Sequence, residues 1–274
     1  MCKDCGCSDP NRLERVTRVH EHAHDHGHPH HHHHEHHSHQ HHEDQADSRT
    51  LSVERSLVEL NDHLAMHNRE RFEEEGVFVV NMMSSPGAGK TRLLERTLDD
   101  LASILNIAVI TGDLQTDNDA QRLWGRGAQV VPVTTGTTCH LEADSVSRAC
   151  EVIDLKPLDV LVIENVGNLV CPASFDLGEA CRVVLMSTTE GEDKPLKYPP
   201  MFKLADVVIV TKTDLADAAG FDREKAVANI RSVTPQARLF ELSAKSGEGL
   251  NDWYTLLLDS APRHFAARES AATV

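Results

Sequence analysis

Runs of consecutive apolar residues alternate with longer mixed segments through most of the chain beyond residue 76. Seven of these runs predict buried β-strands, at 77–83, 107–110, 129–133, 160–163, 183–186, 207–210 and 238–242. Apolar runs without alternation are typical of strands covered on both faces, and the helix-length segments between them favour parallel crossovers. Helices are expected after Lys90, around 120–125, and over 141–153, 223–233 and 250–258. The pattern predicts an α/β fold with a doubly wound, mostly parallel sheet.

A helical pattern precedes the first strand. From Leu51, apolar residues recur at spacings of four, three and four, at Val53, Leu57, Leu60 and Leu64. This periodicity predicts an amphipathic helix that runs toward Glu75 and ends near Gly76.

The segment before this helix has a very different composition. Residues 20–42 hold 15 His in 23 positions, and no Val, Ile, Leu or Phe occurs from His20 to Thr50. Such a segment has no apolar area to offset the entropy of ordering, so we expect it to be disordered. The chain is therefore predicted to have four parts: a Cys motif at 1–7, a disordered His-rich segment at 8–50, an α/β domain at 51–265 and a tail at 266–274.

The charge balance excludes several classes of partner. The 274 residues include 27 Lys and Arg against 43 Asp and Glu, which gives a formal net charge of −16. A chain this acidic repels phosphate backbones and anionic lipids, so nucleic-acid and membrane-surface binding are not expected. No apolar run approaches the roughly 20 residues that span a bilayer, and the N-terminus lacks the apolar core of a secretion signal. The predicted location is the cytoplasm.

A phosphate-binding loop is predicted between the first strand and the next helix. Residues 84–91 read Ser-Ser-Pro-Gly-Ala-Gly-Lys-Thr, which matches a nucleotide-binding P-loop except that Ser84 replaces the usual first Gly. Backbone N–H groups and the helix N-terminus would bind phosphates, Lys90 would bridge the outer phosphates, and the Thr91 hydroxyl would hold Mg²⁺. The alternative is a plain strand-to-helix turn. The predicted nucleotide contacts are Ser85, Pro86, Gly87, Ala88, Gly89, Lys90, Thr91 and Arg92.

Two carboxylates end neighbouring strands of the predicted sheet. Asp113 follows the second strand, and Glu164 ends the fourth and is followed by Gly167. Ligands of open α/β sheets bind beyond the carboxyl ends of strands, so both acids are expected to reach Mg²⁺ directly or through water, and Gly167 to approach the nucleotide. One of them would also orient the attacking water, and Asp113 is favoured for that role over Glu164. The alternative for each is an ordinary solvated loop carboxylate.

Two further strand ends indicate which base is bound. Thr211-Lys212-Thr213-Asp214 and Ser243-Ala244-Lys245 follow the sixth and seventh strands. The pair resembles the guanine-specificity elements of GTPases, in which the Asp carboxylate accepts two hydrogen bonds from the guanine edge. Lys212, Asp214, Ser243, Ala244 and Lys245 are therefore predicted to select GTP over ATP. Thr211 stands where those elements usually carry Asn, which predicts a softer loop contact but leaves Asp214, the discriminating group, in place.

Thiol and imidazole groups at the N-terminus indicate metal binding. Cys2, Cys5 and Cys7 can reach one another on a flexible segment, and a chain of this size does not need disulfides to fold. A redox-active dithiol is the alternative for these cysteines. The His-rich stretch suits weak storage of several Ni²⁺, Zn²⁺ or Cu²⁺ ions, with a cloning tag or a pH-responsive linker as alternatives.

A second set of ligands lies in the α/β domain. Cys139 and His140 are expected to open the helix after the third strand, and Cys171 lies in the loop after the fourth. Three such ligands from two neighbouring loops could make an incomplete site, completed by water or by a second subunit. Cys150 and Cys181 are interpreted as small buried apolar residues instead.

Taken together, these motifs resemble the HypB family of hydrogenase nickel-incorporation GTPases, P-loop proteins related to the urease accessory GTPase. The resemblance runs through the terminal Cys-x-x-Cys-Gly-Cys and the His-rich stretch and covers essentially all of residues 51–260. It is carried within that range by the strings at 84–91, 112–119, 139–143, 164–172 and 189–195.

The resemblance implies slow GTP hydrolysis, nucleotide-dependent homodimers, and delivery of nickel to a NiFe hydrogenase large-subunit precursor alongside the small metallochaperone HypA. It also implies that Cys2, Cys5 and Cys7 form a tight nickel site. A second nickel or zinc site would use Cys139, His140 and Cys171 at the dimer interface. Two alternatives remain open: a nickel storage and sensing protein with a vestigial nucleotide site, and a GTPase for urease maturation.

Overall fold

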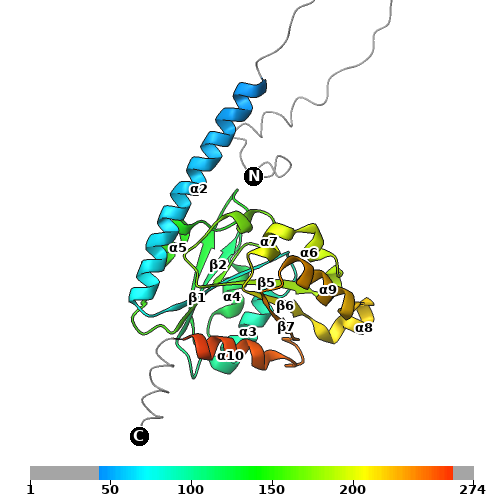
Figure 1. The fold of residues 1–274 in the computed structure, drawn as a ribbon. Helices are drawn as coiled ribbons and strands as arrows, with labels where there is room; N and C mark the ends of the chain where they lie inside the picture. Colours follow the sequence, from blue (N-terminus) through cyan, green and yellow to red (C-terminus); the bar gives the residue numbers. More distant parts are fainter. Residues whose placement is uncertain (1–42, 262–274) are drawn as a thin grey trace, which may run out of the picture. The chain divides into compact units, whose positions relative to one another are not determined.

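The computed structural model describes residues 43–261 (Figure 1). The predicted Cys2, Cys5 and Cys7 site, most of the His-rich segment and the 266–274 tail lie outside the described residues. The chain divides between Leu57 and Val58, and the part after Val58 contains the whole sheet.

A seven-stranded parallel sheet forms the centre of this part. Its strands are β1 (Phe78–Ser84), β2 (Ile107–Asp113), β3 (Gln129–Thr134), β4 (Val160–Glu164), β5 (Cys181–Ser187), β6 (Val207–Thr211) and β7 (Arg238–Glu241). The order across the sheet is β3-β2-β4-β1-β5-β6-β7, and every pairing is parallel. All seven predicted strands are confirmed. Because β1 lies at the centre, with β4 and β5 on either side, the loop that follows β1 emerges in the middle of the sheet's carboxyl edge.

Helices connect the strands. The longer ones are α2 (Glu43–Glu74), α3 (Lys90–Leu101), α9 (Arg223–Val233) and α10 (Leu250–Ser260). Shorter helices are α4 (Asn118–Leu123), α5 (Ala143–Ala149), α6 (Lys194–Lys197), α7 (Pro199–Lys203), α8 (Ala216–Ala219) and the 3₁₀ turns η1 (Cys171–Ser174), η2 (Thr188–Glu190) and η3 (Thr213–Leu215). The five helices expected after the first strand are present, but α5 is shorter than the predicted 141–153. The short helices between 188 and 219 were not predicted.

Both faces of the sheet are covered by helices. On one face α3, α4 and α10 pack their apolar side chains, including the fully buried Leu94 and Trp253, against alternate residues of the strands. On the other face the C-terminal part of α2 and α5 cover β2 and β4, and α7 and α9 cover β5 and β6. The three layers confirm the doubly wound α/β prediction. Among residues 43–261, no helix is long and apolar enough to cross a bilayer.

The prediction that every strand is covered on both faces was wrong at the two edges of the sheet. The central strands β1, β4 and β6 are almost wholly buried, whereas β3 carries no fully buried residue and β7 carries only Phe240. An edge strand has a neighbour on one side only and the helices extend less far over it, so its apolar run reflects partial cover.

The structure also corrects the prediction for α2. The helix begins at Glu43, eight residues before the predicted Leu51. Of the apolar residues that predicted it, Leu57 and Leu60 are exposed, and the face that packs on the sheet domain contains Asn61, Ala65 and Asn68. The amides explain the difference, because Asn68 Nδ2 donates to the Ala143 and Leu177 carbonyls at 2.9 and 3.2 Å. Hydrogen bonds to backbone groups that would otherwise be buried and unpaired favour this face over the apolar one.

Candidate nucleotide and metal sites

The loop between β1 and α3 has the backbone shape of a phosphate cradle. Gly87 and Gly89 have φ values of +78° and +101°, in the left-handed region that glycine adopts without strain. Ser84 does not need this freedom, since Lys212 is the only non-glycine residue with positive φ between 43 and 261. Instead the Ser84 hydroxyl accepts a 2.9 Å hydrogen bond from Lys90 Nζ. Serine at the usual glycine position therefore holds the lysine beside the loop.

A buried carboxylate lies directly behind this loop. Thr91 Oγ1 donates to Glu164 Oε1 at 2.7 Å, and Glu164 is only 2% exposed. Its other oxygen, Oε2, is buried and has no hydrogen-bond partner in the described part of the chain. Burial raises the pKa of the Glu164 carboxyl to about 7, although Lys90 opposes this, and burial also lowers the pKa of Lys90. An unpartnered carboxylate oxygen beside a threonine hydroxyl fits the oxygen ligands that Mg²⁺ requires.

Removing the Glu164 charge is expected to stabilise the nucleotide-free protein above pH 7. The carboxyl titrates near 4.5 when solvated and near 7 in the folded protein. The folded state therefore binds the proton more tightly, and stability falls as pH rises through this window. Glu164→Gln removes the dependence, so the variant should exceed wild type in free energy of unfolding by up to about 3 kcal/mol at about pH 8, and by little near pH 4.5.

Urea unfolding in the presence of a chelator measures this difference at both pH values. Glu59→Gln, on the exposed side of α2, is the matched control and should change stability equally at both. A Glu164→Gln effect that does not vary with pH would contradict the buried-charge explanation.

Asp113 and Gly167 differ in their contacts with the P-loop. The Asp113 carboxylate accepts from Thr116 Oγ1 at 2.8 Å and from the Gln115 amide at 3.4 Å, within its own loop. Gly167 lies against the P-loop, because a Cβ there would lie 3.1 Å from the Pro86 backbone. The structure thus brings Glu164 and Gly167 to the P-loop, whereas Asp113 is held by its neighbours. Its role in orienting water stays a prediction.

A pocket of about 400 Å³ joins the P-loop to both base-recognition segments. Its wall includes eight residues predicted to bind nucleotide or select the base: Ala88, Gly89, Arg92, Lys212, Asp214, Ser243, Ala244 and Lys245. Ser243 Oγ donates to Asp214 Oδ1 at 2.6 Å and itself accepts from the Lys245 and Ser246 amides. These bonds fix the carboxylate in the pocket, where it can accept hydrogen bonds from a bound base.

Thr211 makes the contact that its replacement of asparagine was expected to soften. Its buried hydroxyl donates to the Ala88 carbonyl of the P-loop at 2.6 Å, across 123 positions of sequence. The Thr188 hydroxyl donates to the Lys212 carbonyl at 2.8 Å, which helps to hold Lys212 at its left-handed φ of 58°. A hydroxyl at this position is therefore sufficient to tie the base-recognition loop to the phosphate loop.

The second metal-ligand set is brought together by the fold. The ligand atoms of Cys139, His140 and Cys171 all lie within 4.8 Å of one another, and the two sulfurs are 2.7 Å apart. Ligand atoms of one tetrahedral ion lie about 3.5 to 3.8 Å apart, so modest side-chain rotations would bring these three atoms onto one metal. Cys139 and His140 do not open a helix as predicted, because they lie in the loop before α5.

The environment of His140 suits metal ligation. The ring is buried and stacked on Phe175, with ring centres 3.8 Å apart, and neither nitrogen has a hydrogen-bond partner among residues 43–261. Burial lowers the pKa of His140 to about 4, so the imidazole is neutral at physiological pH. A neutral imidazole can donate its lone pair to a metal without first losing a proton.

Asn165 links this ligand loop to the phosphate site, and sequence reasoning missed it. Asn165 follows Glu164, and its Oδ1 accepts from the Leu141 amide at 3.1 Å, next to His140. Leu141 also packs on Gly112, where a Cβ would lie 2.8 Å from the leucine side chain. Glu164 and His140 are thus connected through two residues: Asn165, which follows Glu164 in the chain, and Leu141, which follows His140 and bonds to Asn165.

Glu190 was also missed. It pairs with Lys194 at 3.2 Å and accepts from the hydroxyl of the P-loop residue Ser85. In the sequence, the only indication of Glu190 was its place in the 189–195 segment that resembles the HypB family. Cys150 and Cys181 are buried as predicted, and burial raises the pKa of the two thiols to about 11 and about 12, so both stay protonated.

Comparison with known proteins agrees with this geometry. The family described as "CobW/HypB/UreG, nucleotide-binding domain" matches residues 78–241. The hydrogenase maturation factor HypB of Rhizobium leguminosarum bv. viciae is 49% identical over 218 residues, which cover 80% of this chain and 73% of the relative. HypB of Escherichia coli (strain K12) is 47% identical over 209 residues, 76% of this chain and 72% of the relative.

Two solved structures share the fold. HypB from Helicobacter pylori, solved in complex with nickel, superposes with a TM-score of 0.70 at 42% identity and covers 73% of this chain and 94% of its own. HypB from Archaeoglobus fulgidus gives 0.68 at 39% identity, covering 72% and 96%. The family match at 78–241 includes the P-loop, Asp214 and the Cys-His-Cys set, and the chain belongs to the HypB hydrogenase maturation factors within the CobW/HypB/UreG family of nucleotide-binding proteins.

Proposed function

We propose that this protein hydrolyses GTP to GDP and phosphate with Mg²⁺, and that its nucleotide state controls a nickel ion bound by Cys139, His140 and Cys171. The observation that carries the proposal is the single pocket that joins P-loop residues to Asp214 and the Ser243 loop. A pocket with a phosphate cradle at one end and a fixed carboxylate acceptor at the other fits a guanine nucleoside triphosphate.

The residues in and beside the pocket have distinct tasks in this proposal. The P-loop N–H groups and Lys90 bind the phosphates, and Thr91 and Glu164 hold Mg²⁺, which supplies charge stabilisation for the developing phosphoryl transition state. Asp113 or Glu164 orients the attacking water. Of these two acids, Glu164 contacts the P-loop, where it accepts a hydrogen bond from Thr91, and this contact supports its role at the phosphates. Asp214 accepts from the guanine edge, and Ser243 holds the Asp214 carboxylate.

The metal part of the proposal rests on the chemistry of the ligand set. Two thiols and a neutral buried imidazole suit Ni²⁺ or Zn²⁺, and three ligands leave a fourth position for water or for a second copy of the chain. The relative from Helicobacter pylori was solved with nickel, which supports nickel here. A homodimer with the site at its interface follows if the second copy provides the missing ligand.

The contact between Asn165 and Leu141 supports a link between the two sites. GTP and Mg²⁺ would order the loops that carry Glu164, Cys139 and Cys171, and hydrolysis would let them relax. Metal affinity would then differ between the GTP and GDP states, by a factor of about 5 to 150 for couplings of typical size.

The test measures nickel-binding stoichiometry and affinity of the full chain with GDP and with a non-hydrolysable GTP analogue. The proposal predicts different affinities in the two states and release of phosphate from GTP. Equal nickel affinity in both states would contradict the coupling, and failure to bind guanine nucleotides would contradict the whole proposal.

Replacing Cys171 with Ala is expected to remove one nickel equivalent from the full chain and to lower affinity at this site at least about tenfold, because only two protein ligands remain. Nickel titration followed by thiolate-to-metal charge-transfer absorption measures the loss. Cys150→Ala is the matched control, because that thiol is buried and protonated. Unchanged stoichiometry in Cys171→Ala would contradict the assignment.

In this proposal, the enzyme that receives the nickel is the one that HypB proteins help to mature. We propose delivery to a NiFe hydrogenase large-subunit precursor together with HypA, with residues 1–7 as a tight nickel site, 8–50 as a metal store and 51–265 as the GTPase domain. A urease role is the second candidate, because a relative in Helicobacter pylori, 38% identical over 226 residues, is a hydrogenase/urease maturation factor. Deletion of the gene followed by nickel assay of both enzymes separates the two.

A further inference from the structure

The solvent face of α2 carries a group of metal-ligating side chains separate from the Cys-His-Cys set. His63 and His67 are four positions apart, so they occupy neighbouring turns of one face. At 100° per residue both lie about 160° around the helix from Ala65, which is fully buried against the domain. Both imidazoles are accordingly exposed, and an ion from solution can reach them.

The spacing of the two rings matches a shared ion. Their centres are 4.6 Å apart, with an angle of 74° between the ring planes. Imidazoles that bind one metal at about 2.0–2.1 Å, with the two bonds about 90° apart, have ring centres about 4.5 Å apart. The rings pack edge to face, and rotation of the two exposed side chains would turn a nitrogen of each ring toward one ion without moving the helix backbone.

A carboxylate one turn further on completes the arrangement. Glu70 Oε2 lies 3.4 Å from His67 Nδ1. Histidines that ligate metals commonly donate their other ring N–H to a carboxylate, which fixes the ring and makes it a better donor. With Nδ1 next to Glu70, Nε2 of His67 is the nitrogen left to bind an ion shared with His63.

We propose that His63 and His67 form a metal site on the outer face of α2 that binds one borderline divalent ion, Ni²⁺, Cu²⁺ or Zn²⁺, with Glu70 as the positioning carboxylate. Imidazole donors favour these ions over Mg²⁺ and Ca²⁺, which prefer oxygen ligands. Two protein nitrogens leave several coordination positions to water, so the ion exchanges rapidly. This site does not depend on nucleotide binding or on the GTPase proposal.

The test must distinguish this site from the many other histidines of the chain, so it needs a local readout. Hydrogen exchange of the full-length protein, read on peptides from residues 58–72, reports on α2 alone. The probe is Ni²⁺ at free concentrations set by a chelator buffer. When free Ni²⁺ is tenfold above the dissociation constant, exchange in α2 should slow about elevenfold, because opening must compete with binding.

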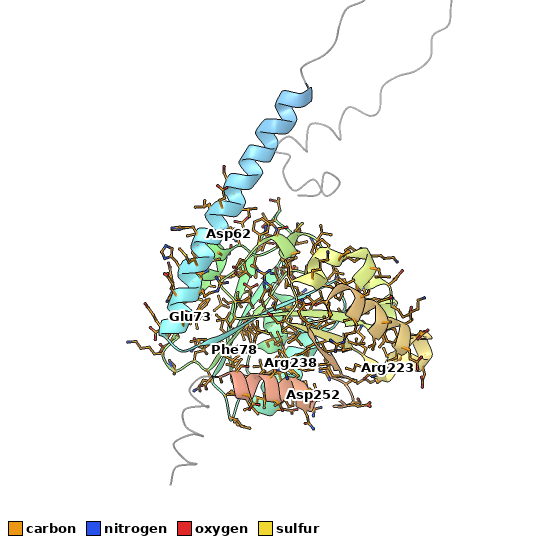
Figure 2. All side chains as sticks on the ribbon, viewed as in Figure 1. Asp62, Glu73, Phe78, Arg223, Arg238 and Asp252 are labelled. Carbon is orange, nitrogen blue, oxygen red and sulfur yellow. The ribbon has the colours of Figure 1, made fainter. Side chains whose placement is uncertain are left out.

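Two variants make the test specific. His67→Ala removes one ligand. The double change Asp62→His with His63→Gln keeps two imidazoles in α2 but places them five positions apart, on different faces; Asp62 is labelled on the helix in Figure 2. All three positions are exposed, and circular dichroism verifies that each variant is folded. Glu70→Gln should shift the nickel midpoint about tenfold higher.

Slowing in wild type that is lost in both variants supports the site. Equal slowing in wild type and in the variant with separated imidazoles would overturn it, because protection would then come from metal bound elsewhere. The absence of slowing in wild type at saturating Ni²⁺ would also overturn it.

Discussion

Replacing Asp214 with Asn should lower kcat/KM for GTP by about 10⁴-fold. In the proposed site the carboxylate accepts from two donors on guanine, whereas an amide presents one acceptor and one NH₂ group, so one guanine donor would face another donor. A site built to hydrogen-bond a polar group rejects a mismatched partner by about 10⁴ to 10⁵ because a buried polar group is left unpaired. Fold and pocket should be unchanged, since Asn Oδ1 can still accept from Ser243, which now bonds Asp214 at 2.6 Å.

The same variant should gain activity with xanthosine triphosphate. Xanthine carries a carbonyl where guanine carries an amino group, and the Asn amide can donate to it while its oxygen accepts from the ring N–H. Phosphate release measured with both nucleotides gives the specificity ratio. Asp217→Asn, on the exposed surface of α8, is the control and should leave both rates unchanged. Undiminished GTP turnover in Asp214→Asn would show that the base is bound elsewhere.

Replacing Lys90 with Ala should lower kcat for GTP hydrolysis by at least about 10² to 10³-fold. The ammonium group lies at the start of α3, 2.9 Å from Ser84 Oγ, where it can stabilise the negative charge that develops on the outer phosphate oxygens. Removing one preorganised donor from a transition-state site typically has an effect of this size. Single-turnover phosphate release at saturating GTP and Mg²⁺ measures it, and Lys156→Ala, outside the site, is the control.

Lys90→Ala also separates delivery from storage. If hydrolysis drives nickel transfer, cells carrying the variant should lack active hydrogenase even though the protein retains its nickel. If the protein only stores nickel, hydrogenase activity should survive. Normal hydrolysis by the purified variant would contradict the P-loop assignment itself.

The sequence was a sufficient guide wherever function depends on local chain chemistry. The P-loop could be predicted because Gly87 and Gly89 provide the left-handed backbone positions and Lys90 follows them directly along the chain. Continuous apolar runs marked the central strands because these strands are buried on both faces. At the edge strand β3 the same signal misled, since an apolar run does not reveal how far the helices extend over it.

The candidate sites depend on contacts that local patterns do not encode. Thr211 could be seen to replace Asn, but its bond to the Ala88 carbonyl follows from the placement of β6 two strands from β1. Asn165 carried no motif of its own, and only its bond to the Leu141 amide shows that it links the two sites. His63 and His67 were absent from the predicted site residues because an exposed histidine pair is a common feature of helices, and only the ring spacing singles it out.

By itself, the sequence determined the strands, the phosphate loop, the base-recognition segments and the kinds of metal ligand, because each depends on residues close together in the chain. Only the tertiary structure decided that Cys139 and Cys171 meet across 32 positions and that Glu164 lies buried on Thr91. It also decided that α2 turns Asn61 and Asn68 inward and leaves Leu60 exposed. The physical reason is that groups far apart in the chain become neighbours only after the strands and helices have packed, and packing also decides which buried polar groups find a hydrogen-bond partner.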